Sequence, residues 1–507
     1  MSNWMSMKED LEDLGAARST MATEPETAHV TRRPQARDIA ITAVVAVVLH
    51  LPSLIRKSAL NSDEATMATV ARMMRHGARL YTGAVDRKPP GAFLVYRLLE
   101  PIFGTWSLTA ARWFALAAIV AAAWIIALEA RRRWPHVVPL AVALLFVVAF
   151  AALPAEDSRA VGFELLAILP MVAAFVLGAR GRVLLAGMAL GVATLFKQPM
   201  LLGALPLTAQ CLSLAAPWSR RLVRLVLSGA VCAATIVLGL APFGLHNALS
   251  WFAGNGDNYL GGTTLSMVAI VTLEQIWSFV SLTGGLIVLA TVAWGKRRPP
   301  LDLTVWVISS VVAASIGFRF VLHYFNQLLP ALVLMAAPAL VSFAVVRRPW
   351  PRFAAVWIAG ASAYSMVTLL TPNSFHDLPN VDNVARAVAE RTQPGDKVFV
   401  WGQAPEIYWL SQRDPATRYP HVQFITGITP RRPGVPAYQL SMPSSAETLL
   451  SDLAANHPAL IIDAAIQRVR GGDRYPMATS PIAAFVKNGY CVVDVIDEIS
   501  LLAPCKP

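Results

Sequence analysis

The segment from Asn61 to Pro90 reads NSDEATMATVARMMRHGARLYTGAVDRKPP. It directly follows the first long apolar segment. It contains an adjacent acidic pair, Asp63 and Glu64, then a short basic helical pattern, and finally Asp86 and the turn Lys88-Pro89-Pro90. Ionisable groups close to lipid are costly and usually functional. We therefore expect this charged stretch to be the centre of a reaction.

The composition predicts a membrane protein. Of the 507 residues, 55% are hydrophobic and only 15% are charged, whereas average soluble domains are roughly 25% charged. Mean hydropathy is +0.52. The formal net charge of +12 comes from short Arg and Lys clusters between apolar runs. That distribution is typical of cytoplasmic loops and argues against a nucleic-acid-binding surface.

Apolar segments long enough to cross a bilayer recur as far as residue 370, and we predict about eleven spans. They are Asp38–Ile55, Leu108–Ala130, His136–Leu153, Ala160–Gly178, Val183–Phe196, Met200–Ala215, Leu222–Phe243, Trp277–Trp294, Leu303–Phe318, Gln327–Val346 and Phe353–Leu370. Basic clusters fall at every second loop, which places those loops and the N-terminus in the cytoplasm. Residues 1–37 lack periodicity and are predicted to be a disordered cytoplasmic tail rather than a signal peptide.

The loops on the opposite side hold every polar cluster that combines both charge signs or contains a histidine. The residues of these clusters are Asp63, Glu64, Asp86 and Lys88 in the first outer loop (56–107), Glu156, Asp157 and Arg159 in the second, Lys197 in the third, His246, Asp257 and Tyr259 in the fourth, and Arg319, His323 and Tyr324 in the fifth. The first loop also carries arginines on a helix that we expect to lie in the membrane interface, near an anionic headgroup. A site on the outer face follows.

Residues 371–507 are predicted to form an extracytoplasmic α/β domain. A helical pattern at 381–391 precedes strand patterns at 397–402 (KVFVWG), Leu460–Asp463 and Cys491–Val495. An odd number of spans places this domain outside. Cys491 and Cys505 can form a disulfide bond in an oxidising compartment, but two cysteines do not establish distance, so both states stay open.

The acidic pair and the proline turn each have two interpretations. Ser62 can cap a helix that ends before Gly77, and the two acids can simply complement the helix dipole. Alternatively one of them is a general base. Only one of the two carboxylates can point into a site, because neighbours at i and i+1 diverge on a helix. Lys88 before two prolines either separates two helices or holds a phosphate, and we favour the phosphate.

The later outer loops carry further alternatives. Asp157 and Arg159 either pair with each other or take part in the site. Lys197 either neutralises an acid or a phosphate, or extends toward water. Arg319 with His323 and Tyr324 suits anion binding. His246 with Asp257 could hold a divalent cation (Mg or Mn), although no ligand spacing supports a metal site.

Taken together, the acidic pair, the KPP turn, the outer His-Tyr pair and the α/β tail resemble the GT-C superfamily of membrane glycosyltransferases. The sequence looks most similar to bacterial relatives of protein O-mannosyltransferases and lipid A aminoarabinose transferases (glycosyltransferase families 39 and 83). The resemblance runs from about Ile39 to the C terminus and is most specific in SDEATMATVARMMRHGARLYTGAVDRKPPG and PGDKVFVWGQAPEIYWLSQRDPATRY.

The resemblance implies roles for individual residues. The aspartate matching Asp63 is the base, assisted by an acid matching Glu156 or Asp157, and the residues matching Lys88 and Arg319 hold the donor phosphate. The chain lacks the large central lumenal domain of eukaryotic protein mannosyltransferases, which argues against a protein acceptor.

We therefore hypothesise an inverting glycosyltransferase of the bacterial plasma membrane, which moves a sugar from polyprenyl phosphate to an extracytoplasmic glycolipid, cell-wall polysaccharide or other glycan. The candidate catalytic residues are Asp63, Glu64, Glu156 and Asp157, and the candidate substrate-binding residues are Lys88, Arg319, His323, Tyr324, Lys197, Tyr81 and Asp86. The alternatives are a polysaccharide ligase or polymerase that uses a diphosphate-linked donor, and a lipid or sugar transporter, which predicts charges near the middle of spans.

Overall fold

The computed structural model describes residues 35–55, 60–254, 265–295, 297–316, 320–345, 349–368, 381–427 and 441–505. The chain divides into two compact units, Met1–Ile39 and Ala40–Pro507, and the second contains every element that bears on the site. Most of the predicted tail 1–37 lies outside the described residues, as do three residues of the predicted outer-loop clusters, Asp257, Tyr259 and Arg319.

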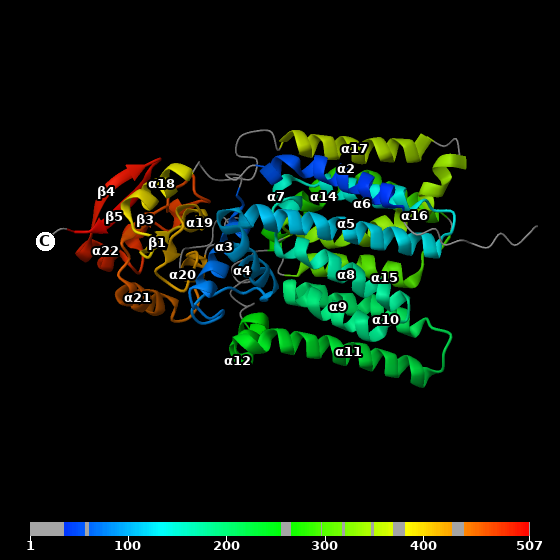
Figure 1. Cartoon of the computed structure of the whole chain (residues 1–507), viewed down its shortest axis with the longest axis horizontal. Helices are drawn as coiled ribbons and strands as arrows, with labels where there is room; N and C mark the ends of the chain where they lie inside the picture. Colours follow the sequence, from blue (N-terminus) through cyan, green and yellow to red (C-terminus); the bar gives the residue numbers. More distant parts are fainter. Residues whose placement is uncertain are drawn as a thin grey trace, which may run out of the picture. The chain divides into compact units, whose positions relative to one another are not determined.

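Each predicted apolar segment coincides with a helix of the bundle in Figure 1. These helices are α2 (Ala36–Ile55), α5 (Ser107–Arg133), α6 (Pro139–Ala151), α8 (Phe163–Ala179), α9 (Val183–Phe196), α10 (Ala204–Leu212), α11 (Trp218–Leu240), α14 (Leu265–Trp294), α15 (Leu301–Ser315), α16 (Leu329–Val345) and α17 (Pro349–Thr368). Short elements connect them: η1 (Gly104–Trp106), α7 (Ala155–Ser158), η2 (Gln198–Gly203), η3 (Ala241–Phe243), α12 (Leu245–Leu249), η4 (Ser250–Gly254) and η5 (Leu322–Leu328).

The helices differ in length. Among the described residues, 4 stretches are long and apolar enough to cross a membrane by length and composition, namely Ala36–Ile55, Gly91–Arg133, Trp218–Phe243 and Val268–Trp294. Several other apolar helices are shorter, including α6, α8, α9 and α15. The number of spans therefore stays a prediction.

Two glycines allow α9 and α11 to pack closely. Gly187 and Gly191 are one helical turn apart, so they share a face of α9. A Cβ at Gly187 would lie 2.2 Å from the Ser228 carbonyl oxygen, and a Cβ at Gly191 would lie 2.6 Å from the Thr235 Cβ. Small residues at this spacing let helix backbones approach each other in a membrane, where association depends on van der Waals packing.

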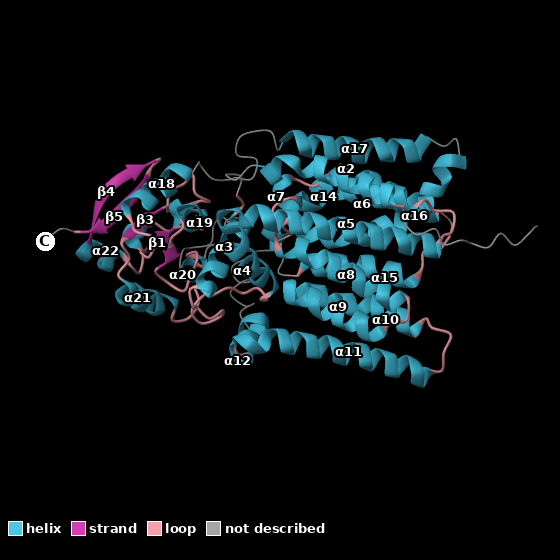
Figure 2. Ribbon diagram, in the orientation of Figure 1, coloured by secondary structure: helices cyan, strands magenta, loops and turns pink. Residues whose placement is uncertain are grey.

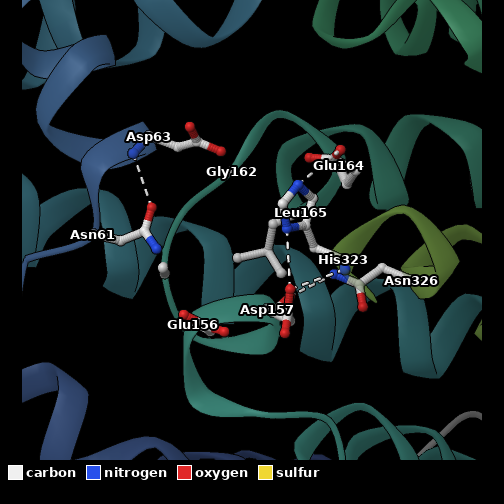
Figure 3. Close-up of a pocket in the computed structure, with 10 residues that line it drawn as sticks. Asn61, Asp63, Glu156, Asp157, Gly162, Glu164, Leu165, His323 and Asn326 are labelled. Carbon is white, nitrogen blue, oxygen red and sulfur yellow. Dashed lines mark hydrogen bonds and ion pairs between the residues drawn. The ribbon is translucent and has the colours of Figure 1, made fainter. Parts of the chain in front are cut away.

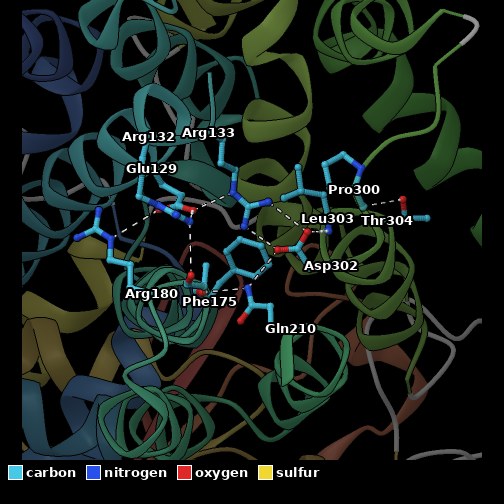
Figure 4. A network of polar contacts seen from close by, with 11 residues as sticks. Glu129, Arg132, Arg133, Phe175, Arg180, Gln210, Pro300, Asp302, Leu303 and Thr304 are labelled. Atoms are coloured by element: carbon cyan, nitrogen blue, oxygen red, sulfur yellow. Dashed lines mark hydrogen bonds and ion pairs between the residues drawn. The ribbon is translucent and has the colours of Figure 1, made fainter. Parts of the chain in front are cut away.

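A buried carboxylate joins several helix ends. Glu129, near the end of α5, is completely buried and pairs with Arg132 at 2.6 Å and Arg133 at 2.8 Å. Arg180, which follows α8, lies 3.6 Å away. Arg133 also pairs with Asp302 of α15 at 2.6 Å. Figure 4 shows that this network links α5, α8 and α15, so basic clusters that we predicted as cytoplasmic markers also hold the bundle together.

The C-terminal part contains a mixed sheet (Figure 2). Its 5 described strands are ordered β2-β1-β3-β5-β4, with β1 parallel to β2 and β3, and β5 antiparallel to β3 and β4. The strands are β1 (Lys397–Trp401), β2 (Asp414–Pro415), β3 (Leu460–Asp463), β4 (Tyr490–Ile496) and β5 (Ile499–Pro504). The helices are α18 (Asp382–Arg391), α19 (Glu406–Ser411), α20 (Gln423–Thr426), α21 (Ser445–Asn456) and α22 (Ala483–Gly489), with turns η6 (Gly472–Arg474) and η7 (Met477–Thr479).

The α/β prediction for this part is confirmed, since β1, β3, β4 and α18 coincide with the predicted patterns. The sequence left the state of Cys491 and Cys505 open, and the structure contains a disulfide bond between them. The antiparallel hairpin brings them together, because Cys491 is opposite Ala503 in the β4–β5 register.

Helix α3 (Ser62–Arg75) is capped one residue earlier than predicted. The N-cap is Asn61 rather than Ser62, because Asn61 and Glu64 have the spacing of a capping box. The Asn61 side chain accepts a hydrogen bond from the Asp63 N–H at 2.8 Å. Gly77 follows the helix with a φ of +99°, the left-handed conformation that favours glycine at a helix end.

Most of α3 is buried, whereas we expected it to lie in the membrane interface. It packs against α4 (Gly91–Phe103) and α19 (Figure 1). The arginines that we expected to face lipid headgroups contact the protein instead: Arg72 pairs with Asp414, and Arg75 with a buried glutamate of α4. Most of the large apolar side chains exposed in the described part of this loop lie on α4, among them Leu98 and Ile102.

The Glu129 network makes a testable contribution to stability. Glu129→Gln should destabilise the protein by about 3 kcal/mol, because removing one partner of a buried ion pair leaves the other charges uncompensated. Thermal unfolding of the detergent-solubilised protein, followed by tryptophan fluorescence, measures the change. Arg220→Gln, an exposed position on α11, is the matched control. Equal unfolding temperatures for the two variants would contradict this assignment.

Candidate functional site

One pocket collects side chains from four separate parts of the chain. The space between its lining side chains and the adjoining open solvent together amount to about 300 Å³. Its lining residues come from the start of α3, the second outer loop, the start of α8, and η5: Asn61, Asp63, Glu156, Asp157, Ala160, Gly162, Glu164, Leu165, His323 and Asn326. Figure 3 shows Asp63 facing Asp157, His323 and Glu164 across this space.

Asp63 and Glu64 point in different directions, as neighbours on a helix must. Asp63 is exposed and lines the pocket. Glu64 is completely buried, where Arg112 of α5 donates two hydrogen bonds to it at 2.9 and 2.6 Å. The main-chain N–H of Val161 donates a third at 2.8 Å. The structure therefore places Asp63 in the pocket and uses Glu64 to hold the backbone around it.

Opposite Asp63, four ionisable side chains form a chain of contacts. The Asp157 carboxylate accepts hydrogen bonds from the His323 main-chain N–H at 2.9 Å and contacts the His323 Nδ1 at 3.0 Å. The other ring nitrogen, Nε2, lies 3.7 Å from Glu164. Glu164 forms an ion pair with Lys197, whose ammonium lies 3.5 Å from the centroid of the Tyr324 ring. The second, third and fifth outer loops therefore meet at one place.

Lys88 reaches the same region from the first outer loop. Its ammonium lies 5.7 Å from the centroid of Phe163, the residue before Glu164 at the start of α8. Its main-chain N–H donates to Asp86 at 2.9 Å, and its carbonyl accepts a hydrogen bond from the Tyr81 hydroxyl at 3.0 Å. Tyr81 and Asp86, both buried, thus hold the turn that carries Lys88.

The pKa values of this region reflect mutual electrostatic effects. Burial raises the pKa of Asp86, and Lys88 opposes that rise. Burial lowers the pKa of Lys197 well below its usual range; Lys88 adds to the decrease and Asp63 opposes it. Burial also lowers the pKa of His421, from the C-terminal domain, to about 3, and the charge of Asp63 counteracts this. These groups therefore lie within electrostatic range of one another.

The predicted residues divide into three groups by their placement. Asp63, Glu156, Asp157 and His323 line the pocket. Lys197 contacts the lining residue Glu164, and Tyr324 contacts Lys197. Lys88, Tyr81 and Asp86 form the adjoining turn. Glu64 lies outside the pocket, and Arg319 outside the described residues.

Arg159 does not pair with Asp157, the first of the two interpretations of this loop. It is buried and donates to the main-chain carbonyls of Ala151 and Leu153, each at 2.9 Å. It also donates to the Ser365 hydroxyl at 2.7 Å. Arg159 thus caps the end of α6 and supports the loop that carries Asp157.

Three polar side chains of the lining, Glu164, Asn61 and Asn326, were not predicted. Glu164 carried a usable signal, because an acid in the first turn of an apolar helix is costly unless it is paired or used. Asn61 could have been found from its capping-box spacing. Asn326 donates to the Asp157 carbonyl at 2.7 Å, a contact between distant loops that no local pattern indicates.

The described residues offer no preformed metal centre. Among the described residues, no group of three Asp, Glu, His or Cys side chains could hold one ion. In the pocket itself, His323 engages Asp157, and Lys197 pairs with Glu164. The alternative pair, His246 with Asp257, includes a residue outside the described part of the chain. The divalent cation stays a prediction.

No model of a known protein family matches the sequence, and no curated protein matches it. Solved structures are similar to it. ArnT from Cupriavidus metallidurans in the apo state has a TM-score of 0.62 at 16% identity, over 92% of this chain and 97% of that one. ArnT bound to undecaprenyl phosphate has a TM-score of 0.59 at 17% identity, with the same coverage. The archaeal oligosaccharyltransferase AglB from Archaeoglobus fulgidus, in complex with an inhibitory peptide and a dolichol-phosphate, has a TM-score of 0.52 at 13% identity, over 93% and 74% of the two chains.

These identities are low, so the similarity concerns the fold. It extends over 92% of the chain, so it is not confined to the apolar helices or to the C-terminal part. ArnT and AglB are GT-C proteins, and the resemblance expected from the sequence is confirmed. The chain therefore has the GT-C fold of these structures, and 4 of its described stretches are long and apolar enough to cross a membrane.

Proposed function

We propose that the protein is an inverting glycosyltransferase that transfers a sugar from a polyprenyl-phosphate donor to an extracytoplasmic glycan or glycolipid. The observation that carries this proposal is the pocket in which Asp63 faces the Asp157–His323–Glu164 chain, with Lys88 and Lys197 nearby. An exposed carboxylate and two cations are what the attack of a hydroxyl and the departure of a phosphate require.

Asp63 is the general base of the proposed reaction. It takes the proton from an acceptor hydroxyl while that oxygen attacks the anomeric carbon of the donor sugar. The new bond joins the acceptor oxygen to the anomeric carbon. The bond from that carbon to the phosphate oxygen breaks, and the phosphate leaves with the electron pair. Attack from the side opposite the phosphate inverts the anomeric configuration.

Lys88 and Lys197 stabilise the charge that develops on the leaving phosphate. Lys88 stands on a turn stiffened by two prolines and held by Tyr81 and Asp86. Lys197 is paired with Glu164, and a neighbouring carboxylate favours the charged form of the amine against the effect of burial. His323 supplies a further donor, oriented by Asp157. Arg319, predicted as a phosphate ligand, remains part of this proposal.

The similar structures and the disulfide bond support this assignment. ArnT has been solved with undecaprenyl phosphate and AglB with a dolichol-phosphate, both of which are polyprenyl-type phosphates. Disulfide bonds persist in oxidising compartments, so the Cys491–Cys505 bond favours a C-terminal domain outside the cytoplasm of a bacterial plasma membrane. The transporter alternative is less well supported, since the charged residues of the pocket lie at helix ends.

Substitution of Asp63 tests the proposed base. Asp63→Asn should lower kcat roughly 10²- to 10⁴-fold, the usual contribution of general base catalysis, and should leave the binding of undecaprenyl phosphate unchanged. Transfer is measured with the purified protein and a panel of synthetic polyprenyl-phosphate sugars. Turnover equal to that of the wild type would rule out Asp63 as the base.

The neighbouring acid is a matched control for this experiment. Glu64→Gln removes the counter-charge of Arg112, so its main effect should be a lower unfolding temperature. The two substitutions should therefore have different effects. Asp63→Asn should lower kcat without changing the unfolding temperature, whereas Glu64→Gln should mainly lower the unfolding temperature.

Lys88 should contribute to donor binding. Lys88→Gln is expected to weaken the binding of undecaprenyl phosphate by roughly 10- to 100-fold, because a hydrogen bond to a charged group contributes about 1.5–3 kcal/mol. Microscale thermophoresis of the protein in nanodiscs measures this affinity. Lys487→Gln, an exposed lysine of α22, should have no effect. Unchanged affinity in the Lys88 variant would remove this residue from the phosphate site.

A further inference from the structure

We propose that the C-terminal domain is a positioning element for the first outer loop, and that Arg72 and Asp414 are the residues through which it keeps Asp63 in place. This inference rests on the proposed role of Asp63 as the base. It assigns a function to a part of the chain whose described residues, 381–427 and 441–505, do not line the pocket.

The first connection joins the end of α3 to strand β2. Arg72 of α3 donates to the Asp414 carboxylate at 2.8 Å and to the main-chain carbonyl of Gln412 at 2.8 Å. A third hydrogen bond runs to the Gln412 side chain, and His76 also contacts Asp414. The side chains of Arg72 and Asp414 are 11% and 19% exposed. A guanidinium with three partners in a mostly buried position holds a fixed orientation.

The segment that receives Arg72 is itself rigidly held. Gln412 ends α19 in the left-handed conformation, with a φ of +54°. A residue without glycine's freedom keeps such a conformation only when its surroundings enforce it. The adjacent Arg413 is buried and donates to the Thr392 hydroxyl at 2.8 Å and the Thr392 carbonyl at 2.7 Å. The connection to α3 is thus anchored in the interior of the C-terminal domain.

A second connection holds the loop just before Lys88. The main-chain N–H of Val85 donates to the carbonyl of Arg418 at 2.9 Å. Val85 also packs into the apolar core of the C-terminal domain. Arg87 lies 4.8 Å from the centroid of the Phe424 ring. Arg418 is fixed in turn by Asp452, at 2.9 and 2.8 Å.

The two connections lie close to the two residues that the reaction requires. Arg72 is nine residues from Asp63 on one continuous helix, which corresponds to about 14 Å along a rigid rod. Val85 precedes Lys88 by three residues. Because the same domain holds both, it sets the distance from the base to the phosphate ligand. Displacement by about 1 Å can lower turnover on the order of 10²-fold, even when it originates far from the reacting atoms.

The test uses the full chain in lipid nanodiscs with Arg72→Gln, Asp414→Asn and the double variant. We expect kcat for polyprenyl-phosphate sugar transfer to fall on the order of 10²-fold, while affinity for undecaprenyl phosphate stays at the wild-type value. The double variant should be no worse than either single variant, since all three interrupt one connection. Arg72→Lys keeps the charge but loses the planar fork, so its kcat should be intermediate.

Amide hydrogen exchange provides a readout that does not depend on activity. Exchange in α3 should be faster in the Arg72 and Asp414 variants, with exchange in α5 unchanged. Arg391→Gln is the matched control, because it breaks a more exposed ion pair with Asp494 in the same domain, at 2.6 Å. That variant should leave both kcat and α3 exchange at the wild-type values.

Three results would overturn the inference: wild-type kcat in Arg72→Gln, an equal loss of kcat in Arg391→Gln, or a loss of undecaprenyl phosphate binding as large as the loss of kcat. Failure of the proposed function is a separate outcome. If Asp63→Asn keeps full turnover, then Asp63 is not the base, whatever α3 exchange shows in the Arg72 variants.

Discussion

The arrangement of the site depends on the buried ion pair between Glu64 and Arg112. Arg112 donates to both oxygens of Glu64, at 2.9 and 2.6 Å, and to the carbonyl of Ser53 at the end of α2, at 2.7 Å. Glu64 also accepts a hydrogen bond from the Val161 main chain at 2.8 Å. One pair thus joins α2, α3, α5 and the second outer loop. Because Asp63 directly precedes Glu64, this constraint brings it opposite Asp157.

The same physical rule governs the other charges of the membrane region. Burying an ion without a partner is prohibitively costly, and three buried charges of the described residues are compensated by a carboxylate, by cations or by several carbonyl groups. Glu129 is compensated by arginines, Lys197 by Glu164, and Arg159 by carbonyls and hydroxyls. Asp63 differs, because it is exposed at the pocket. A carboxylate kept accessible among compensated charges is available to act on a substrate, which is why our proposal assigns the chemistry to it.

Features that depend on local sequence patterns were predictable, whereas contacts between distant segments were not. Long apolar runs predicted the helices, and the β1, β3 and β4 patterns predicted most of the sheet, since hydrophobic periodicity reports secondary structure directly. The outer-loop charges predicted a common site containing Asp63, Asp157 and His323. The sequence could not show that Arg112 pairs with Glu64, nor that Arg72 pairs with Asp414, 342 residues away. Such pairs depend on tertiary packing, which no periodicity encodes. The helix α3 was therefore expected at a lipid surface, although its arginines in fact contact protein.

The central claim is that loops far apart in the sequence form one site for a lipid-linked phosphate beside Asp63. The most direct measurement is an electron cryo-microscopy structure of the full chain with bound undecaprenyl phosphate. We expect phosphate density within hydrogen-bond distance of Lys88 or Lys197, with the space next to Asp63 open for a sugar. Phosphate density among Arg132, Arg133 and Arg180, at the other charged cluster of the bundle, would contradict it.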